Sequence, residues 1–141
     1  ISNFNVTLTT IHLNGGKDMI EAASSEKGNI KILGVSILTS LSENDIFEIT
    51  HTEFDAYFNN LISIASNTNV DGVVCSPNEL DKLKNFNKLK VVPGIRKDIS
   101  DDDQKRVMSP MEAYKKGADF IVVGRPITKS EDPRKALELF L

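Results

Sequence analysis

The sequence lacks the features that mark several large classes of protein. Its 141 residues contain a single cysteine, Cys75, which excludes an internal disulfide and a cysteine-rich metal site. No apolar run is long enough to cross a bilayer. The formal net charge is −3 and the sequence pI is about 5.4, so the chain has no excess of positive charge for nonspecific binding of nucleic acid. We therefore expect neither a membrane nor a nucleic-acid partner.

Several familiar site motifs are also missing. The sequence has no P-loop, no dinucleotide-binding fingerprint and no paired Glu/His metal motif, and we expect no metal site. No signal peptide is visible, which makes the cytoplasm the expected location. The chain begins at Ile1 rather than at a methionine, which indicates a fragment or a processed or engineered chain. What remains is an ordinary globular composition, 40% hydrophobic and 26% charged, enough for one domain with a core.

Short apolar runs alternate along the chain with segments of helical spacing. The pattern shows about five such strand–helix units and no hairpin signal, which predicts a parallel α/β sheet with its strands in sequence order. The expected strands are residues 6–13, 30–38, 72–75, 91–92 and 120–123. The expected helices are residues 17–25, 43–49, 54–66, 79–84, 110–116 and 134–141.

The most informative stretch runs from residue 90 to residue 128. Two Val- and Ile-rich runs end there at Gly94 and Gly124, and each glycine is followed by an arginine, Arg96 or Arg125. Glycine lets the backbone approach a ligand closely, and the guanidinium fork suits phosphate. In (β/α)8 barrels a phosphate site commonly forms from the loops after the last two strands. The stretch therefore predicts a phosphate site.

Other polar residues allow two interpretations each. Thr39 and Ser40 follow the second expected strand and could bind a polar ligand, or Ser40 or Ser42 could cap the next helix; the sequence leaves both open. His12 is interpreted as a packed or hydrogen-bonded residue in preference to a catalytic one. Asn78 is expected to cap the helix at 79–84.

Two further candidates are interpreted as structural. No base is evident beside Cys75, so we interpret it as a small buried strand residue and not as a nucleophile. The acidic run Asp101, Asp102 and Asp103, with Asp98 before it, is interpreted as a solvated loop. Three consecutive aspartates cannot all face one metal ion.

Taken together, these motifs resemble the bacterial type of orotidine 5′-phosphate decarboxylase. The matches occur in family order and cover essentially the whole chain. The resemblance implies a (β/α)8 barrel that converts orotidine monophosphate to uridine monophosphate without a cofactor, and a homodimer. The matching segments are Ile11-His12, Gly15-Gly16, Ile37-Leu-Thr-Ser40, Asp71-Gly-Val-Val-Cys-Ser76, Val92-Pro-Gly-Ile-Arg96, Asp103-Gln104, Pro110 and Val122-Val-Gly-Arg-Pro-Ile-Thr128.

The resemblance also assigns substrate-binding residues. The family's phosphate-binding arginine falls on Arg96 and the glutamine of its phosphate loop falls on Gln104. Its final Gly-Arg pair falls on Gly124 and Arg125, and the threonine that contacts the pyrimidine falls on Thr39. The same positions argue against a different ribulose-phosphate-binding barrel, such as an epimerase or an aldolase.

The sequence departs from the family pattern in two places. After the arginine the family usually has Pro and Gly, whereas this chain has Lys97-Asp98-Ile99. The family's catalytic Asp-x-Lys-x-x-Asp segment does not occur, so no catalytic residue is assigned. We expect residues 1–141 to form one partial barrel domain that resembles strands four to eight of the family's barrel. The rest of the barrel could be another chain. The alternative is a non-catalytic half-barrel that binds phosphate or a partner chain.

Overall fold

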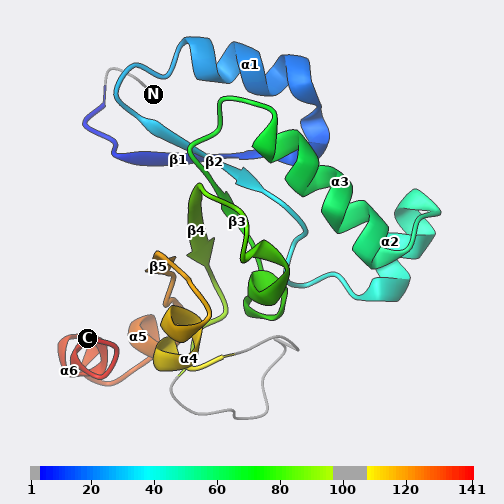
Figure 1. Ribbon diagram of the computed structural model, residues 1–141. Coiled ribbons are helices and arrows are strands. Elements are labelled where there is room, and N and C mark those ends of the chain that lie inside the picture. The colour runs from blue at the N-terminus through cyan, green and yellow to red at the C-terminus, as the bar shows by residue number, and fades with distance from the viewer. Residues whose placement is uncertain (1–3, 97–107) are drawn as a thin grey trace.

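A computed structural model of the chain describes residues 4–96 and 108–141. Its centre is one sheet of five strands in the order β1-β2-β3-β4-β5 (Figure 1). The strands are β1 (Leu8–His12), β2 (Lys31–Val35), β3 (Gly72–Val74), β4 (Leu89–Val92) and β5 (Phe120–Ile121). The helical segments are η1 (Leu13–Gly15), α1 (Lys17–Ser25), α2 (Glu43–Thr50), α3 (Phe54–Ser66), η2 (Pro77–Leu83), α4 (Pro110–Lys115), α5 (Arg125–Thr128) and α6 (Pro133–Glu138).

All four pairings in this sheet are parallel, as the alternating pattern predicts. Each pair of neighbouring strands is joined through at least one helical segment, the connection that parallel strands require. The carboxyl ends of the strands therefore share one edge of the sheet. None of the helices in the described part of the chain is long and apolar enough to span a bilayer.

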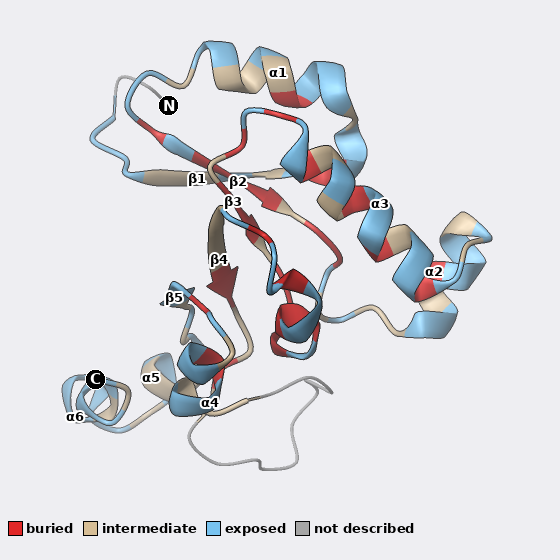
Figure 2. Ribbon diagram, viewed as in Figure 1, coloured by how far each residue is buried: buried red, intermediate tan, exposed pale blue. Residues whose placement is uncertain are grey.

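The core lies between the sheet and the helices that cover it. Phe58 and Leu61 on α3 are buried, and they share one cluster with Ile32 of β2, Val73 of β3 and Leu13 of η1. Figure 2 shows this burial along the central strands and on the inward sides of the helices. The helical spacing of apolar residues in 54–66 thus correctly predicts the buried face of α3. Met19 of α1 is apolar but 41% exposed.

Serine side chains fix the starts of three helical segments. Ser42 begins α2 and Ser109 begins α4, each in a reciprocal capping box with the acidic residue three positions later. Ser76 begins η2 in the same way, so the prediction that Asn78 caps this segment is wrong. The reason is Pro77, whose fixed φ suits the first helical position and places the cap one residue earlier.

The carboxyl-terminal part of the chain differs from the prediction in two respects. The fifth strand is shorter than expected, although the N–H of Val122 still donates to the carbonyl of Val92 at 2.9 Å. The segment Arg125–Thr128, expected as a loop, forms the single helical turn α5. In this sheet β1 and β5 are the two edge strands, each paired with one neighbour only.

Candidate phosphate site

The loops that follow β4 and β5 meet around one hollow at the carboxyl-terminal edge of the sheet. Its volume is about 230 Å³. The two strands pair in register, Val92 with Ile121, so the loops that follow them leave the sheet side by side. The residues that line the hollow are Pro93, Gly94, Ile95, Arg96, Val122, Gly124, Arg125 and Pro126. The structure thus brings together the two Gly–Arg loops that the sequence singled out.

The loop after β4 is held in place by Met108. Gly94 has a φ of +76°, a conformation that favours glycine over residues with a side chain. Ile95 is 2% exposed and forms a parallel bridge with Met108, and the N–H of Arg96 donates to the carbonyl of Met108 at 3.0 Å. The backbone of Arg96 is therefore fixed beside the hollow.

The loop after β5 turns at once into α5. The carbonyl of Gly124 accepts from the N–H of Ile127 at 2.9 Å and of Thr128 at 3.1 Å, which closes the turn. Pro126 lies in its first turn, where proline is tolerated because no N–H is needed. A Cβ placed on Gly124 would meet nothing within 4 Å, so the space beside this backbone is open. A ligand group can approach the main chain there.

The composition of the hollow suits an anion with several acceptor oxygens. Two guanidinium-bearing residues come from different loops, and two glycines leave room near the backbone. Arginine binds phosphate through paired N–H groups, so two arginines can contact one phosphate from two directions. No group of three or more His, Cys, Asp or Glu residues suited to a metal ion occurs in 4–96 and 108–141.

Two of the predicted substrate-binding residues lie elsewhere. Thr39 lies in the turn after β2, which is closed by a hydrogen bond from the N–H of Leu41 to the carbonyl of Leu38 at 3.0 Å. It shares the carboxyl-terminal edge of the sheet with the hollow but does not line it, because β3 separates β2 from β4. Gln104 and the acidic run around it lie outside the described residues.

The structure also tests the predictions for Cys75, His12 and Ser42. Cys75 is buried as predicted, and burial raises the pKa of its thiol to about 12, which makes it a poor nucleophile. His12 is exposed at the end of β1, so the packed alternative is wrong, whereas the interpretation as a hydrogen-bonded residue stays a prediction. Ser42 caps α2, and this settles the capping alternative without assigning a role to Thr39 and Ser40.

Half of the residues that line the hollow, Gly94, Arg96, Gly124 and Arg125, were predicted from the sequence. Pro93, Ile95, Val122 and Pro126 also line the hollow, and none was predicted as a site residue. Their positions directly beside the Gly–Arg pairs are the signal that could have identified them. Arg-Pro after a glycine is also typical of a helix start, and it could have predicted α5.

Comparisons with known proteins point to one family. The profile of the orotidine 5′-phosphate decarboxylase / HUMPS family matches residues 1–140. Orotidine 5′-phosphate decarboxylase of Aquifex aeolicus is 46% identical over 145 residues, covering 98% of this chain and 62% of the relative. The Ehrlichia chaffeensis enzyme of the same name is 41% identical, with 98% and 63% covered.

A solved structure shows the same fold. The crystal structure of orotidine 5′-phosphate decarboxylase from Lactobacillus acidophilus matches with a TM-score of 0.79 and 33% sequence identity. The match covers 95% of this chain and 61% of that one, so the chain spans about three fifths of the length of the proteins it resembles. The parallel sheet and its helices are therefore the predicted part of a (β/α)8 barrel.

Proposed function

The chain belongs to the orotidine 5′-phosphate decarboxylase / HUMPS family, and from this membership we propose that it carries the phosphate-binding part of an orotidine 5′-phosphate decarboxylase. The reaction would convert orotidine monophosphate to uridine monophosphate in pyrimidine biosynthesis. The observation that carries the proposal is the hollow between the loops after β4 and β5, lined by Arg96 and Arg125.

In this proposal the hollow holds the phosphate of the nucleotide. Arg96 and Arg125 donate to its oxygens from two loops, while Gly94 and Gly124 keep the backbone accessible. The ribose and pyrimidine then extend along the carboxyl-terminal edge of the sheet, past β3, toward Thr39 after β2. Gln104, which lies outside the described residues, would be a further contact to the phosphate.

Such a site contributes to catalysis at a distance. Contacts to a phosphate that does not react can stabilise a closed, water-excluding state in which the reaction proceeds, so their binding energy is used at the transition state. No lysine in this chain lies in the family's Asp-x-Lys-x-x-Asp pattern. The lysine of that pattern would protonate the carbon as carbon dioxide leaves. The residues described above therefore bind and orient the substrate, and proton transfer is assigned to none of them.

Calorimetric titration of the chain with uridine monophosphate and with uridine tests the proposal. The two ligands differ only in the phosphate, so we expect the nucleotide to bind at least tenfold more tightly, the equivalent of about 1.4 kcal/mol. Equal affinity for the two would contradict a phosphate site.

The homodimer, the cytoplasmic location and the treatment of residues 1–141 as one domain stay predictions.

A further inference from the structure

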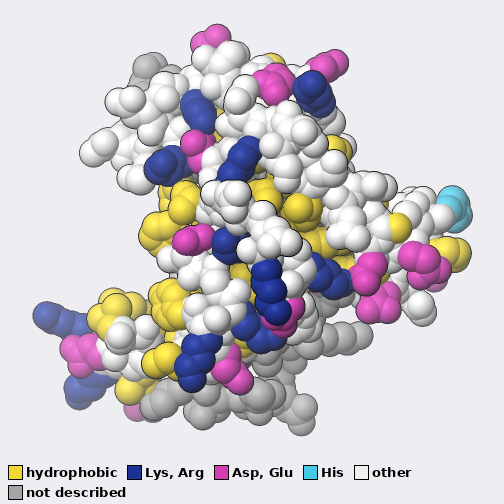
Figure 3. All heavy atoms as spheres, viewed as in Figure 1, with side chains coloured by type: hydrophobic (Ala, Val, Ile, Leu, Met, Phe, Trp, Pro, Cys, Tyr) yellow, Lys and Arg dark blue, Asp and Glu magenta, His cyan; other side chains and the backbone are white. Residues whose placement is uncertain are grey.

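A second hollow lies at the other end of the sheet from the phosphate site. It is formed where β4 begins and where η2 and α4 end, and its volume is about 410 Å³. Four lysines and one aspartate line it together with Leu83 and Gly117: Lys84, Lys90, Lys115, Lys116 and Asp81. We call it the lysine hollow. Figure 3 shows Lys and Arg side chains gathered over this part of the surface.

The acidic residues nearby do not balance these lysines. Asp81 forms ion pairs with both Lys84, at 3.2 Å, and Lys116, and so uses both carboxylate oxygens. Hydrogen bonds from Lys116 and Lys84 hold the pKa of the Asp81 carboxyl below its usual value. Asp119 lies 4.0 Å from the ammonium of Lys90. Hydrogen bonds with Ser109 lower the pKa of the Glu112 carboxyl, and the positive charges of Lys116 and Lys115 also help to lower it. Four lysines therefore face three acidic residues, in a chain whose formal net charge is −3.

The ammonium groups retain unused hydrogen-bond donors. Each carries three N–H groups. Lys90 donates one to the carbonyl of Phe86, at 3.2 Å, and its stem passes Gly117, where a Cβ would lie 3.7 Å from its Cε. Lys115 has no ion-pair partner within the described part of the chain. Like charges gathered at one place repel each other, so the hollow is electrostatically prepared for an anion.

We propose that the lysine hollow binds a small anion with two neighbouring phosphate groups. Lysine binds phosphate as a point charge, and the lysines that line this hollow come from three separate parts of the chain, so they can contact more than one phosphate group. The volume is in the range of small-ligand sites. The net negative charge of the chain favours a small anion over a long polyanion such as nucleic acid, which would also meet the acidic surface.

Titration of the chain with inorganic pyrophosphate, followed by calorimetry and by NMR of the backbone amides, tests this proposal. We expect amide shifts at Lys84, Lys116 and Gly117. The double variant Lys84→Gln/Lys115→Gln should bind pyrophosphate at least tenfold more weakly. Both side chains are on the surface, and circular dichroism verifies that the variant is folded. Lys135→Gln, an exposed lysine of α6, is the matched control and should change the affinity less than twofold.

Further titrations identify the ligand and distinguish the lysine hollow from the proposed nucleotide site. Inorganic phosphate should bind at least tenfold more weakly than pyrophosphate. A nucleoside diphosphate that binds as well as pyrophosphate, or better, supports the same chemistry and identifies a nucleotide source. In Arg125→Ala the amide shifts that pyrophosphate induces at Lys84, Lys116 and Gly117 should persist, because these residues report on the lysine hollow alone. The proposal is overturned if the double variant binds within twofold of wild type, or if the shifts are confined to residues 94–96 and 124–125.

Discussion

Arg125 is the side chain on which the phosphate proposal depends most directly. It lines the hollow from α5, opposite the loop that carries Arg96. Arg125→Ala removes a charge-assisted contact and should weaken the binding of uridine monophosphate by about 1.5–3 kcal/mol, roughly 10- to 150-fold. Arg134→Ala, which changes an exposed arginine of α6, is the matched control and should alter the affinity less than twofold. Calorimetry measures both, and equal affinities for the two variants would exclude Arg125 from the site.

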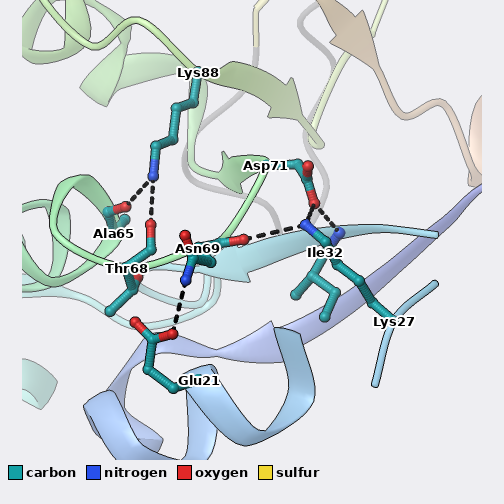
Figure 4. Close-up of polar contacts among 8 residues, drawn as sticks. All are labelled: Glu21, Lys27, Ile32, Ala65, Thr68, Asn69, Asp71 and Lys88. Atoms are coloured by element: carbon teal, nitrogen blue, oxygen red, sulfur yellow. Dashed lines mark hydrogen bonds and ion pairs between the residues drawn. The ribbon is translucent and has the colours of Figure 1, made fainter. Parts of the chain in front are cut away.

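Asp71 has a different kind of role, at the amino-terminal end of the sheet. Its carboxylate accepts from the N–H of Ile32 at 2.8 Å and from the ammonium of Lys27 at 2.6 Å (Figure 4). Its own N–H donates to the carbonyl of Ile32 at 2.7 Å. Burial raises the pKa of the Asp71 carboxyl, but the hydrogen bonds from Lys27 and Ile32 outweigh it, so this pKa lies below its usual value.

Replacing Asp71 should destabilise the fold measurably. Asp71→Ala leaves the N–H of Ile32 and the ammonium of Lys27 without this acceptor, and should lower the free energy of unfolding by about 2 kcal/mol. Glu131→Ala, at an exposed position, should change it by less than about 0.5 kcal/mol. Urea unfolding at neutral pH measures both. A loss below about 0.5 kcal/mol for Asp71→Ala would show that this contact contributes little.

The lowered pKa of Asp71 also predicts a pH dependence. A carboxyl whose pKa is lower in the folded state stabilises the fold fully above its unfolded pKa, about 3.9 for aspartate. This contribution is lost as the pH falls through the lower pKa of the folded state. The difference in unfolding free energy between wild type and Asp71→Asn should therefore shrink as the pH is lowered from about 7 to about 2. A difference that stays constant would contradict the assignment.

Among the elements, β3 and β4 approach each other with little space to spare. A Cβ on Gly72, the first residue of β3, would lie 2.4 Å from the carbonyl oxygen of Leu89 in β4. Backbone cannot move aside as a flexible side chain can. Gly72→Ala should therefore lower the free energy of unfolding by about 1–3 kcal/mol. Ala56→Ser adds one atom on the exposed side of α3 and should be nearly neutral. Equal urea midpoints for the two variants would contradict the close approach.

The elements themselves were largely predictable from local signals. Helical spacing identified α3, and runs of β-branched residues identified the central strands, because burial imposes these periods on the sequence. Strand ends were less predictable, because the backbone pairing that ends β2 at Val35 depends on β3, which is distant in the sequence. The turn α5 was missed because four residues carry too little periodicity to stand out.

In the molecule as a whole, the part of the site that lies in two successive loops could be predicted from the sequence. Gly94, Arg96, Gly124 and Arg125 follow two successive strands, and parallel pairing of β4 with β5 places their loops together. Thr39 could be placed on the same edge of the sheet, but its distance from the hollow depends on the whole sheet. The lysine hollow carried no sequence signal, because its lysines come from three elements separated along the chain.

The open sheet leads to a prediction about activity. The 141-residue polypeptide lacks the Asp-x-Lys-x-x-Asp pattern, and the edge strands β1 and β5 leave the described sheet unclosed, so water would reach a bound substrate. On its own it should not decarboxylate orotidine monophosphate, as followed by substrate absorbance. Addition of a fragment with the family's first three strand–helix units should restore activity if the two parts dock. Turnover by the polypeptide alone, at the rate of a complete enzyme, would show that the catalytic residues have been misplaced.

The proposed function depends on the binding of a nucleotide's phosphate between the loops after β4 and β5. A crystal structure of the chain with uridine monophosphate tests it most directly. We expect phosphate density in the hollow, within hydrogen-bond distance of the Arg125 side chain and close to the backbone of Gly94 and Gly124. A phosphate bound at the lysine hollow with the arginine hollow empty, or a nucleotide bound with its base between the arginines, would contradict it.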